Sequence, residues 1–126
     1  MIGYVTLGTN DIVKAAQFYD SLFEVLGGSR FMEFESFIAW STGPDQPSVC
    51  VTKPFNGEPA TIGNGVMIAL MVDSNDKVDK VYKKAIELGA QDEGPAGPRG
   101  DIEGFYAGYF RDPDGNKLNV FHMPSP

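Results

Sequence analysis

Hydrophobic and polar positions along the chain change period twice, in the same order each time. Residues 4–11 and 67–73 are short strand-like runs in which apolar side chains dominate. After each run, apolar residues recur at helical spacing, over residues 12–26 and 74–88. Gly27 and Gly89 follow these segments, and glycine tolerates the left-handed conformation that ends many helices. The pattern therefore predicts two strand–helix units, capped at Asn10 or Asp11 and at Ser74 or Asn75.

The two units are also nearly in register with one another. Leu70 follows Leu7, and Tyr82 follows Tyr19, by the same 63 residues (70 − 7 and 82 − 19). Short strand-like runs come after each helix, at residues 30–34, 36–41 and 48–52 in the first half and at residues 105–110 and 117–122 in the second. The glycine- and proline-rich residues 94–100 predict a mobile loop, and residues 112–116 predict a turn.

This order of elements predicts one α+β domain over residues 1–126, built from two βαβββ modules. The modules span about residues 1–56 and 65–122, with residues 57–64 as the linker. We expect the two modules to form a curled mixed sheet with a small-molecule pocket at their seam.

The net charge and the cysteine count limit which partners and which covalent cross-links we expect. The net charge of −7 over 126 residues disfavours binding to nucleic acid or to anionic membranes. Cys50 is the only cysteine, so no disulfide forms within the chain. The N-terminus has no signal-peptide pattern, and we expect a cytoplasmic protein.

The chain contains a characteristic segment from Tyr106 to Asn116. In it, the turn sequence Asp-Pro-Asp-Gly-Asn follows a strand-like run and precedes another. With the paired βαβββ layout, it resembles the vicinal oxygen chelate superfamily, which includes glyoxalase I, bleomycin- and fosfomycin-resistance proteins and extradiol dioxygenases. The resemblance implies concave sheet faces that enclose a ligand, and it implies that enzymes of this type hold a divalent metal there through two His and one Glu. It also implies a homodimer.

The positions that correspond to these metal ligands carry other residues. They fall at Tyr4, Met67 and Asn119, a set with no formal charge at neutral pH. His122, the only histidine, has the opposite strand parity and is expected to make a local hydrogen bond. We therefore predict neither a metal site nor another cofactor.

Strand alternation predicts which side chains line the concave faces. Trp40 and Tyr109 are expected to flank the pocket, and Arg99 can reach it if its loop closes, whereas Cys50 is expected to be a buried, inert thiol. The predicted ligand-binding residues are Tyr4, Thr6, Trp40, Met67, Ala69, Arg99, Tyr109, Asn119 and Phe121.

Three functions remain open from the sequence. The first is a glyoxalase/bleomycin-resistance-like protein that binds a small, partly apolar molecule in a metal-free cup. The second is an enzyme of the superfamily, lyase or dioxygenase-like, with a non-standard site in which Tyr4 acts as acid or base and Asn119 assists. The third is a structural or regulatory domain whose cup is filled by side chains. The sequence leaves open whether the cup forms within one chain or across a dimer.

Overall fold

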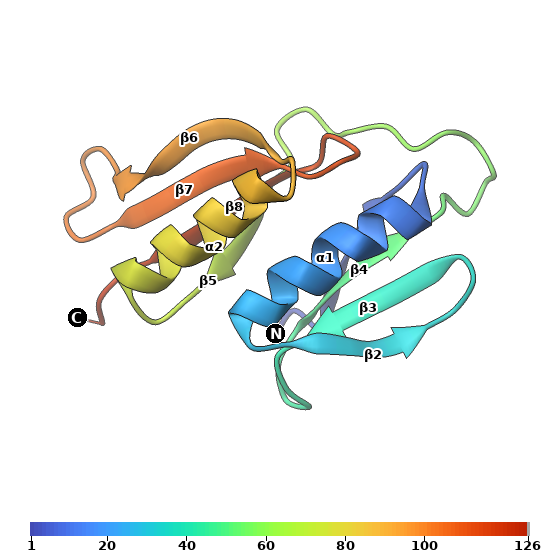
Figure 1. Cartoon of the computed structure of the whole chain (residues 1–126), viewed down its shortest axis with the longest axis horizontal. Helices are drawn as coiled ribbons and strands as arrows, with labels where there is room; N and C mark the ends of the chain where they lie inside the picture. Colours follow the sequence, from blue (N-terminus) through green and yellow to red (C-terminus); the bar gives the residue numbers. More distant parts are fainter. Residues whose placement is uncertain (126) are drawn as a thin grey trace.

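The computed structural model describes residues 1–125, and Pro126, the last residue of the predicted domain, lies outside the described residues. The chain folds as two consecutive βαβββ modules (Figure 1). The first contains β1 (Tyr4–Gly8), α1 (Ile12–Leu26), β2 (Ser29–Glu33), β3 (Phe37–Ser41) and β4 (Ser48–Thr52). The second contains β5 (Ile68–Met71), α2 (Asn75–Glu87), β6 (Gln91–Pro98), β7 (Tyr106–Arg111) and β8 (Lys117–His122). The predicted α+β class and the paired modules are confirmed.

Each module has its own four-stranded sheet, with the orders β1-β4-β3-β2 and β5-β8-β7-β6. The first strand of each module runs parallel to the last, and the other neighbours are antiparallel. Figure 1 shows both helices on the same side of the sheets, side by side, and α1 and α2 contact each other. Consequently, each sheet has one face covered by its helix and one face turned away, which we call the open face.

The helix boundaries follow from local backbone chemistry. The side chain of Asp11 accepts a hydrogen bond from the amide of Lys14, and the Ser74 hydroxyl accepts one from the amide of Lys77. Gly27 has a φ of 87°, the left-handed conformation that L side chains adopt only with strain. The predicted helix ends are therefore confirmed, and of the two candidate caps in each unit, Asp11 and Ser74 are the ones used.

The predicted strand alternation is visible in the burial of β1. Leu7 points to the helix side and is buried, whereas Tyr4 is 66% exposed on the open face. The same parity holds in β5, where Met71 is 76% exposed and Leu70 packs against the core. The core of the chain thus lies between the helices and the sheets, while the exposed side chains Tyr4 and Met71 lie on the open faces.

The prediction of a mobile loop over residues 94–100 is wrong. β6 is an eight-residue strand that pairs with β7, with register shifts at Gly94 and Gly97. Because β6 is an edge strand, the missing amide hydrogens of Pro95 and Pro98 cost fewer ladder hydrogen bonds than they would in a central strand. The register shifts next to Gly94 and Gly97 act as β-bulges: they leave residues of β6 unpaired, so that pairing with β7 resumes on either side.

Candidate functional site on the open face of the second sheet

Four of the predicted ligand-binding residues lie on the open face of the second sheet. Asn119 on β8 is in register with Ala69 on β5 and with Tyr109 on β7, and Phe121 is two residues further along β8. Residues directly opposite each other on neighbouring strands have Cβ atoms about 5 Å apart. The pairing therefore brings Ala69, Tyr109 and Asn119 into one row.

The remaining predicted residues are distributed differently. Tyr4 and Thr6 are exposed on the open face of the first sheet, and Met67 is half-exposed immediately before β5. The sheets share no backbone ladder among residues 1–125. Whether these residues act together with Asn119 on one ligand remains a prediction.

The predicted position of Trp40 beside the pocket is wrong. Its side chain is 0% exposed and lies on the helix side of β3, with its ring centroid 5.4 Å from that of Tyr19 and 6.3 Å from that of Phe23. The open-face positions next to it on β3 are Ala39 and Ser41. Because side chains alternate, an error of one residue in matching the two modules moves a side chain to the opposite face.

Asn119 combines burial with an unmet hydrogen-bonding requirement. It is 2% exposed, between Leu118 and Val120, which face α2 and are fully buried. Its amide oxygen, Oδ1, has no hydrogen-bond partner within the described residues. A buried polar atom without a partner costs free energy, so this oxygen identifies a position where an external group can donate a hydrogen bond.

Two cations lie against the aromatic ring beside Asn119. The guanidinium carbon of Arg99 is 5.3 Å from the centroid of Tyr109, and Nζ of Lys117 is 5.6 Å from the same centroid. Both distances are in the range of cation–π attraction. The Arg99 guanidinium donates a hydrogen bond to the carbonyl oxygen of Pro95, while its Nε is buried without a partner in residues 1–125.

Sequence reasoning missed Lys117, although a signal for it was present. Lys117 lies two residues before Asn119 on the same strand, so alternation places both on the open face. Arg99 was anticipated, but it directly follows β6 and already contacts Tyr109, so no loop closure is needed to bring it there.

Two hollows border this face. One, of about 540 Å³, lies between the segment 62–67 and the side chains of Arg111 and Lys117. The other is a largely apolar groove of about 460 Å³ at the seam of the modules, and its lining includes Val5, Val49, Ile68 and Leu70. Val5, Ile68 and Leu70 pack against the core on the helix side of their strands, so this groove differs from the pocket predicted on the concave faces.

The residues at the family's metal positions do not fit a divalent cation. Tyr4, Met67 and Asn119 supply no negative charge, and the cations Arg99 and Lys117 repel a metal ion on the open face that carries Asn119. Across residues 1–125, no three side chains of the His, Cys, Asp and Glu types are grouped as metal ligands would be.

The histidine and the cysteine take no part in this face. Nδ1 of His122 is 2.9 Å from Oδ1 of Asn75 at the start of α2, so His122 faces the helix side, as its strand parity predicts, although its partner is 47 residues away in the chain. Cys50 is buried as predicted, and desolvation raises the pKa of its thiol. A thiol with a raised pKa is a poor nucleophile at neutral pH.

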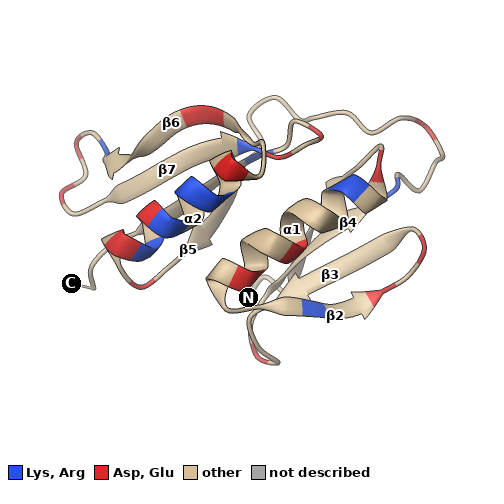
Figure 2. Cartoon of the chain, viewed as in Figure 1, with Lys and Arg blue, Asp and Glu red and all other residues tan. Residues whose placement is uncertain are grey.

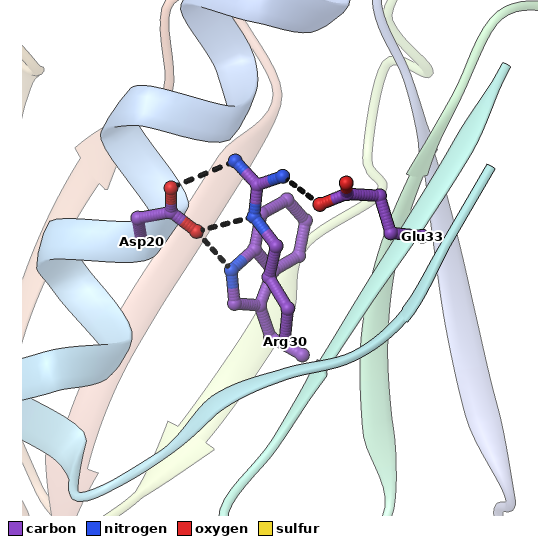
Figure 3. A network of polar contacts seen from close by, with 4 residues as sticks. Asp20, Arg30 and Glu33 are labelled. Carbon is purple, nitrogen blue, oxygen red and sulfur yellow. Dashed lines mark hydrogen bonds and ion pairs between the residues drawn. The ribbon is translucent and has the colours of Figure 1, made fainter. Parts of the chain in front are cut away.

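A second polar cluster joins α1 to β2 on the first module (Figure 3). The Arg30 guanidinium makes two hydrogen bonds to the Asp20 carboxylate, of 2.7 and 2.8 Å, and also pairs with Glu33. Nε1 of Trp40 donates a further hydrogen bond to Asp20, at 2.9 Å. The hydrogen bonds from Arg30 are the main cause that lowers the pKa of Asp20. Both carboxylate oxygens of Asp20 already accept hydrogen bonds from Arg30 or Trp40. The cluster therefore holds β2 against α1, and Asp20 is not free to act as an acid or a base.

The Asp-Pro-Asp-Gly-Asn turn joins the two modules. The Tyr19 hydroxyl on α1 donates a 2.7 Å hydrogen bond to Oδ2 of Asp112, and Nδ2 of Asn116 donates to the carbonyl of Gly8 at 3.0 Å. Asp114 accepts a hydrogen bond from the amide of Asn10 at 2.9 Å. Burial raises the pKa of Asp112, and hydrogen bonds from Tyr19 and Asn116 partly offset that effect. The turn is therefore a structural connection between modules and is not part of the open face.

With the fold and this face described, comparison with known proteins gives the class. The family model for the Glyoxalase/Bleomycin resistance protein/Dioxygenase superfamily matches residues 1–120, and the chain belongs to this superfamily. The predicted resemblance is thus confirmed.

Solved structures agree with this assignment. A glyoxalase/bleomycin resistance protein from Albidiferax ferrireducens T118 is 33% identical with a TM-score of 0.89, and the match covers 98% of this chain and 99% of that one. A hypothetical protein, SA1046, from S. aureus is 25% identical with a TM-score of 0.72, covering 98% and 93% of the two chains. A lactoylglutathione lyase from Agrobacterium tumefaciens shares the fold at 21% identity, with a TM-score of 0.72 and coverage of 97% and 92%.

No curated protein matches the chain. Neither helix in residues 1–125 is long and apolar enough to cross a membrane.

Proposed function

We propose that this protein binds a small, partly apolar molecule on the open face of its second sheet, without a divalent metal. The observation that carries the proposal is Asn119, a buried amide whose oxygen lacks a partner among the described residues. Around it, Ala69, Phe121 and Tyr109 supply apolar and aromatic surface. Ligand sites commonly combine such a surface with a few polar groups that fix orientation.

We further propose that the protein is a homodimer. Tyr4 and Met71 are large side chains that lie mostly exposed on the two open faces, and contiguous exposed apolar surface commonly marks an interface. A second copy placed over these faces would enclose the Asn119 face and complete a cup. Tyr4 and Thr6 would then reach the ligand from the partner.

A thermal-shift screen of small aromatic and aliphatic molecules in the presence of EDTA tests the binding proposal. We expect several compounds to raise the melting temperature of the wild-type protein, since a ligand that binds only the folded state stabilises it. Asn119→Leu, which keeps a similar volume and removes the amide, should abolish the shift. Gln17→Ala, which removes an exposed amide from α1, is the matched control and should leave it unchanged.

The same screen separates the rival functions. A flat response from the wild-type protein would favour a structural domain whose open face is filled by side chains. A response that appears only after Mn²⁺, Ni²⁺ or Zn²⁺ is added would contradict metal-independent binding.

A further inference from the structure

The second sheet carries an unbalanced pair of positive charges in an acidic protein. The net charge of the chain is −7, yet Arg99 and Lys117 both lie within 6 Å of the ring of Tyr109. Neither cation has a carboxylate oxygen within 4 Å in the part of the chain that the structure describes, where the ion pairs involve Arg30 and Arg111. Because both cations lie against the same ring, an anion bound beside Tyr109 would be attracted by each of them.

The two acidic residues of β6 already have partners. Glu93 forms a 2.8 Å ion pair with Arg111. Asp92 accepts hydrogen bonds from the Tyr82 hydroxyl at 2.7 Å and from the amide of Gly94 at 2.8 Å. The Tyr82 hydroxyl is the main cause that lowers the pKa of Asp92, and Arg99 contributes, so Asp92 offsets part of the charge of Arg99. Lys117 forms no ion pair within residues 1–125, so an external anion would add the counter-charge that this side of the ring lacks.

The distribution of charge over the rest of the chain differs from this arrangement. Figure 2 shows lysines and acidic residues interspersed along α2, on the side of the molecule opposite the open faces. Lys80 and Lys83 are exposed on that helix, where solvent screens them. Arg99 and Lys117 instead lie against an aromatic ring, next to the unpartnered oxygen of Asn119.

We infer that Arg99 and Lys117 bind the anionic group of the ligand, a carboxylate or a phosphate, beside Tyr109. This inference rests on the proposed small-molecule site and specifies the chemical class of its ligand. The apolar part of the ligand occupies the hollow of about 540 Å³ that Lys117 borders together with Ile62, Val66 and Met67. A hydroxyl or amino group next to the anionic group donates to Oδ1 of Asn119. The face on which the family resemblance implies a divalent cation would thus hold an anion in this protein.

Chemical-shift titration of ¹⁵N-labelled protein with benzoate, phenyl phosphate and benzamide tests the inference. The three probes share a phenyl ring and differ in the charge and shape of the head group. At constant ionic strength, we expect benzoate or phenyl phosphate to shift the amide signals of Tyr109, Lys117 and Asn119 at lower concentration than benzamide does. The stronger of the two anions identifies the head group that the site prefers.

Variants assign the effect to the two cations. Lys117→Met keeps the length of the side chain and should weaken binding of the anions by roughly tenfold or more, with little effect on benzamide. Arg99→Gln is the second variant and should act in the same direction. Lys83→Met makes the same charge change on α2 and should leave all three affinities unchanged.

Each contrary outcome has a separate meaning. Equal binding of benzamide and the anions, or loss of anion affinity in Lys83→Met as large as in Lys117→Met, would overturn the inference and leave the small-molecule site intact. If none of the three probes shifted signals on the open face, both the inference and the proposed binding site would be contradicted.

Discussion

Tyr19 connects the two modules through its hydroxyl group. Its hydroxyl donates to Asp112, and both side chains are buried. Tyr19→Phe removes one donor from a buried carboxylate, so we expect the free energy of unfolding to fall by about 1–3 kcal/mol. Urea denaturation followed by circular dichroism measures this change.

Tyr106→Phe is the matched control for that variant. The Tyr106 hydroxyl donates to Asp79 at 2.6 Å, but Asp79 is exposed, so water replaces the lost donor. We expect a loss of less than about 1 kcal/mol. A loss as large as that of Tyr19→Phe would show that burial of the acceptor does not determine the cost.

The raised pKa of Tyr19 leads us to expect that the stability of the folded protein depends on pH in the alkaline range. Desolvation is the largest cause that raises the pKa of Tyr19 well above its ordinary value of 10.0. Because the folded state holds this proton more tightly, its contribution to stability is complete below about pH 10 and is lost as the pH rises further.

Unfolding measurements between pH 8 and pH 11 test this effect. The wild-type protein should lose stability above about pH 10, and Tyr19→Phe should lose less over the same interval. Burial raises the pKa of Tyr82 to about 12, so part of the dependence should remain in the variant. Parallel pH profiles for the two proteins would contradict the assignment to Tyr19.

At this scale, local chemistry was predictable and distant contacts were not. The helix caps at Asp11 and Ser74 depend on residues within three positions, and the sequence shows them. Asp112 was predicted only as part of a turn, because its partner Tyr19 is 93 residues away in the chain. The orphaned oxygen of Asn119 is likewise visible only once the neighbouring strands are in place.

At the scale of the elements, α2 packs so closely on β7 that position 108 has no space for a side chain. A Cβ atom on Gly108 would lie 2.8 Å from Cδ1 and 3.0 Å from Cγ of Tyr82. The Tyr82 hydroxyl is fixed by Asp92, so the ring cannot move without breaking that hydrogen bond. Gly108→Ala should therefore destabilise the protein by about 1–3 kcal/mol, as overpacking does.

Gly97→Ala on β6 is the control for this prediction. A Cβ atom there meets no atom within 4 Å, so the change in stability should stay within about 0.5 kcal/mol. Thermal or urea unfolding of both variants gives the comparison. Equal stability of the two would show that α2 shifts away from β7 at no cost.

The strands show how far a periodic pattern can be used. Both helices and most strands follow from periodicity, and β4 and β8 have the predicted bounds. β6 was not predicted because its prolines and glycines disfavour strands in general, whereas an edge position with bulges tolerates them. The error at Trp40 arose from matching β3 to β7 one residue out of register, which inverts the face on which a side chain lies.

At the scale of the whole molecule, the two open faces predict self-association. Size-exclusion chromatography with light scattering should give twice the chain mass of 13.7 kDa. Met71→Lys places a charge on the most exposed part of β5 and should shift the population towards the monomer. A wild-type monomer at micromolar concentration would contradict the dimer.

The overall architecture was predictable because two repeats of one pattern constrain it strongly. The site was less predictable, because it depends on which charges meet on one face of the sheet. Lys117 and Arg99 come from separate strand ends and meet at Tyr109 only in the folded chain. Their presence is also what most clearly separates this site from a metal centre.

The most direct test of the account is a calorimetric titration of the EDTA-treated, dialysed protein with Mn²⁺, Ni²⁺ and Zn²⁺. Since Tyr4, Met67 and Asn119 offer no negative ligand and two cations lie on the Asn119 face, we predict no stoichiometric binding of any of the three ions. Binding of one ion per chain that Asn119→Ala abolishes would contradict the central claim of a metal-independent site.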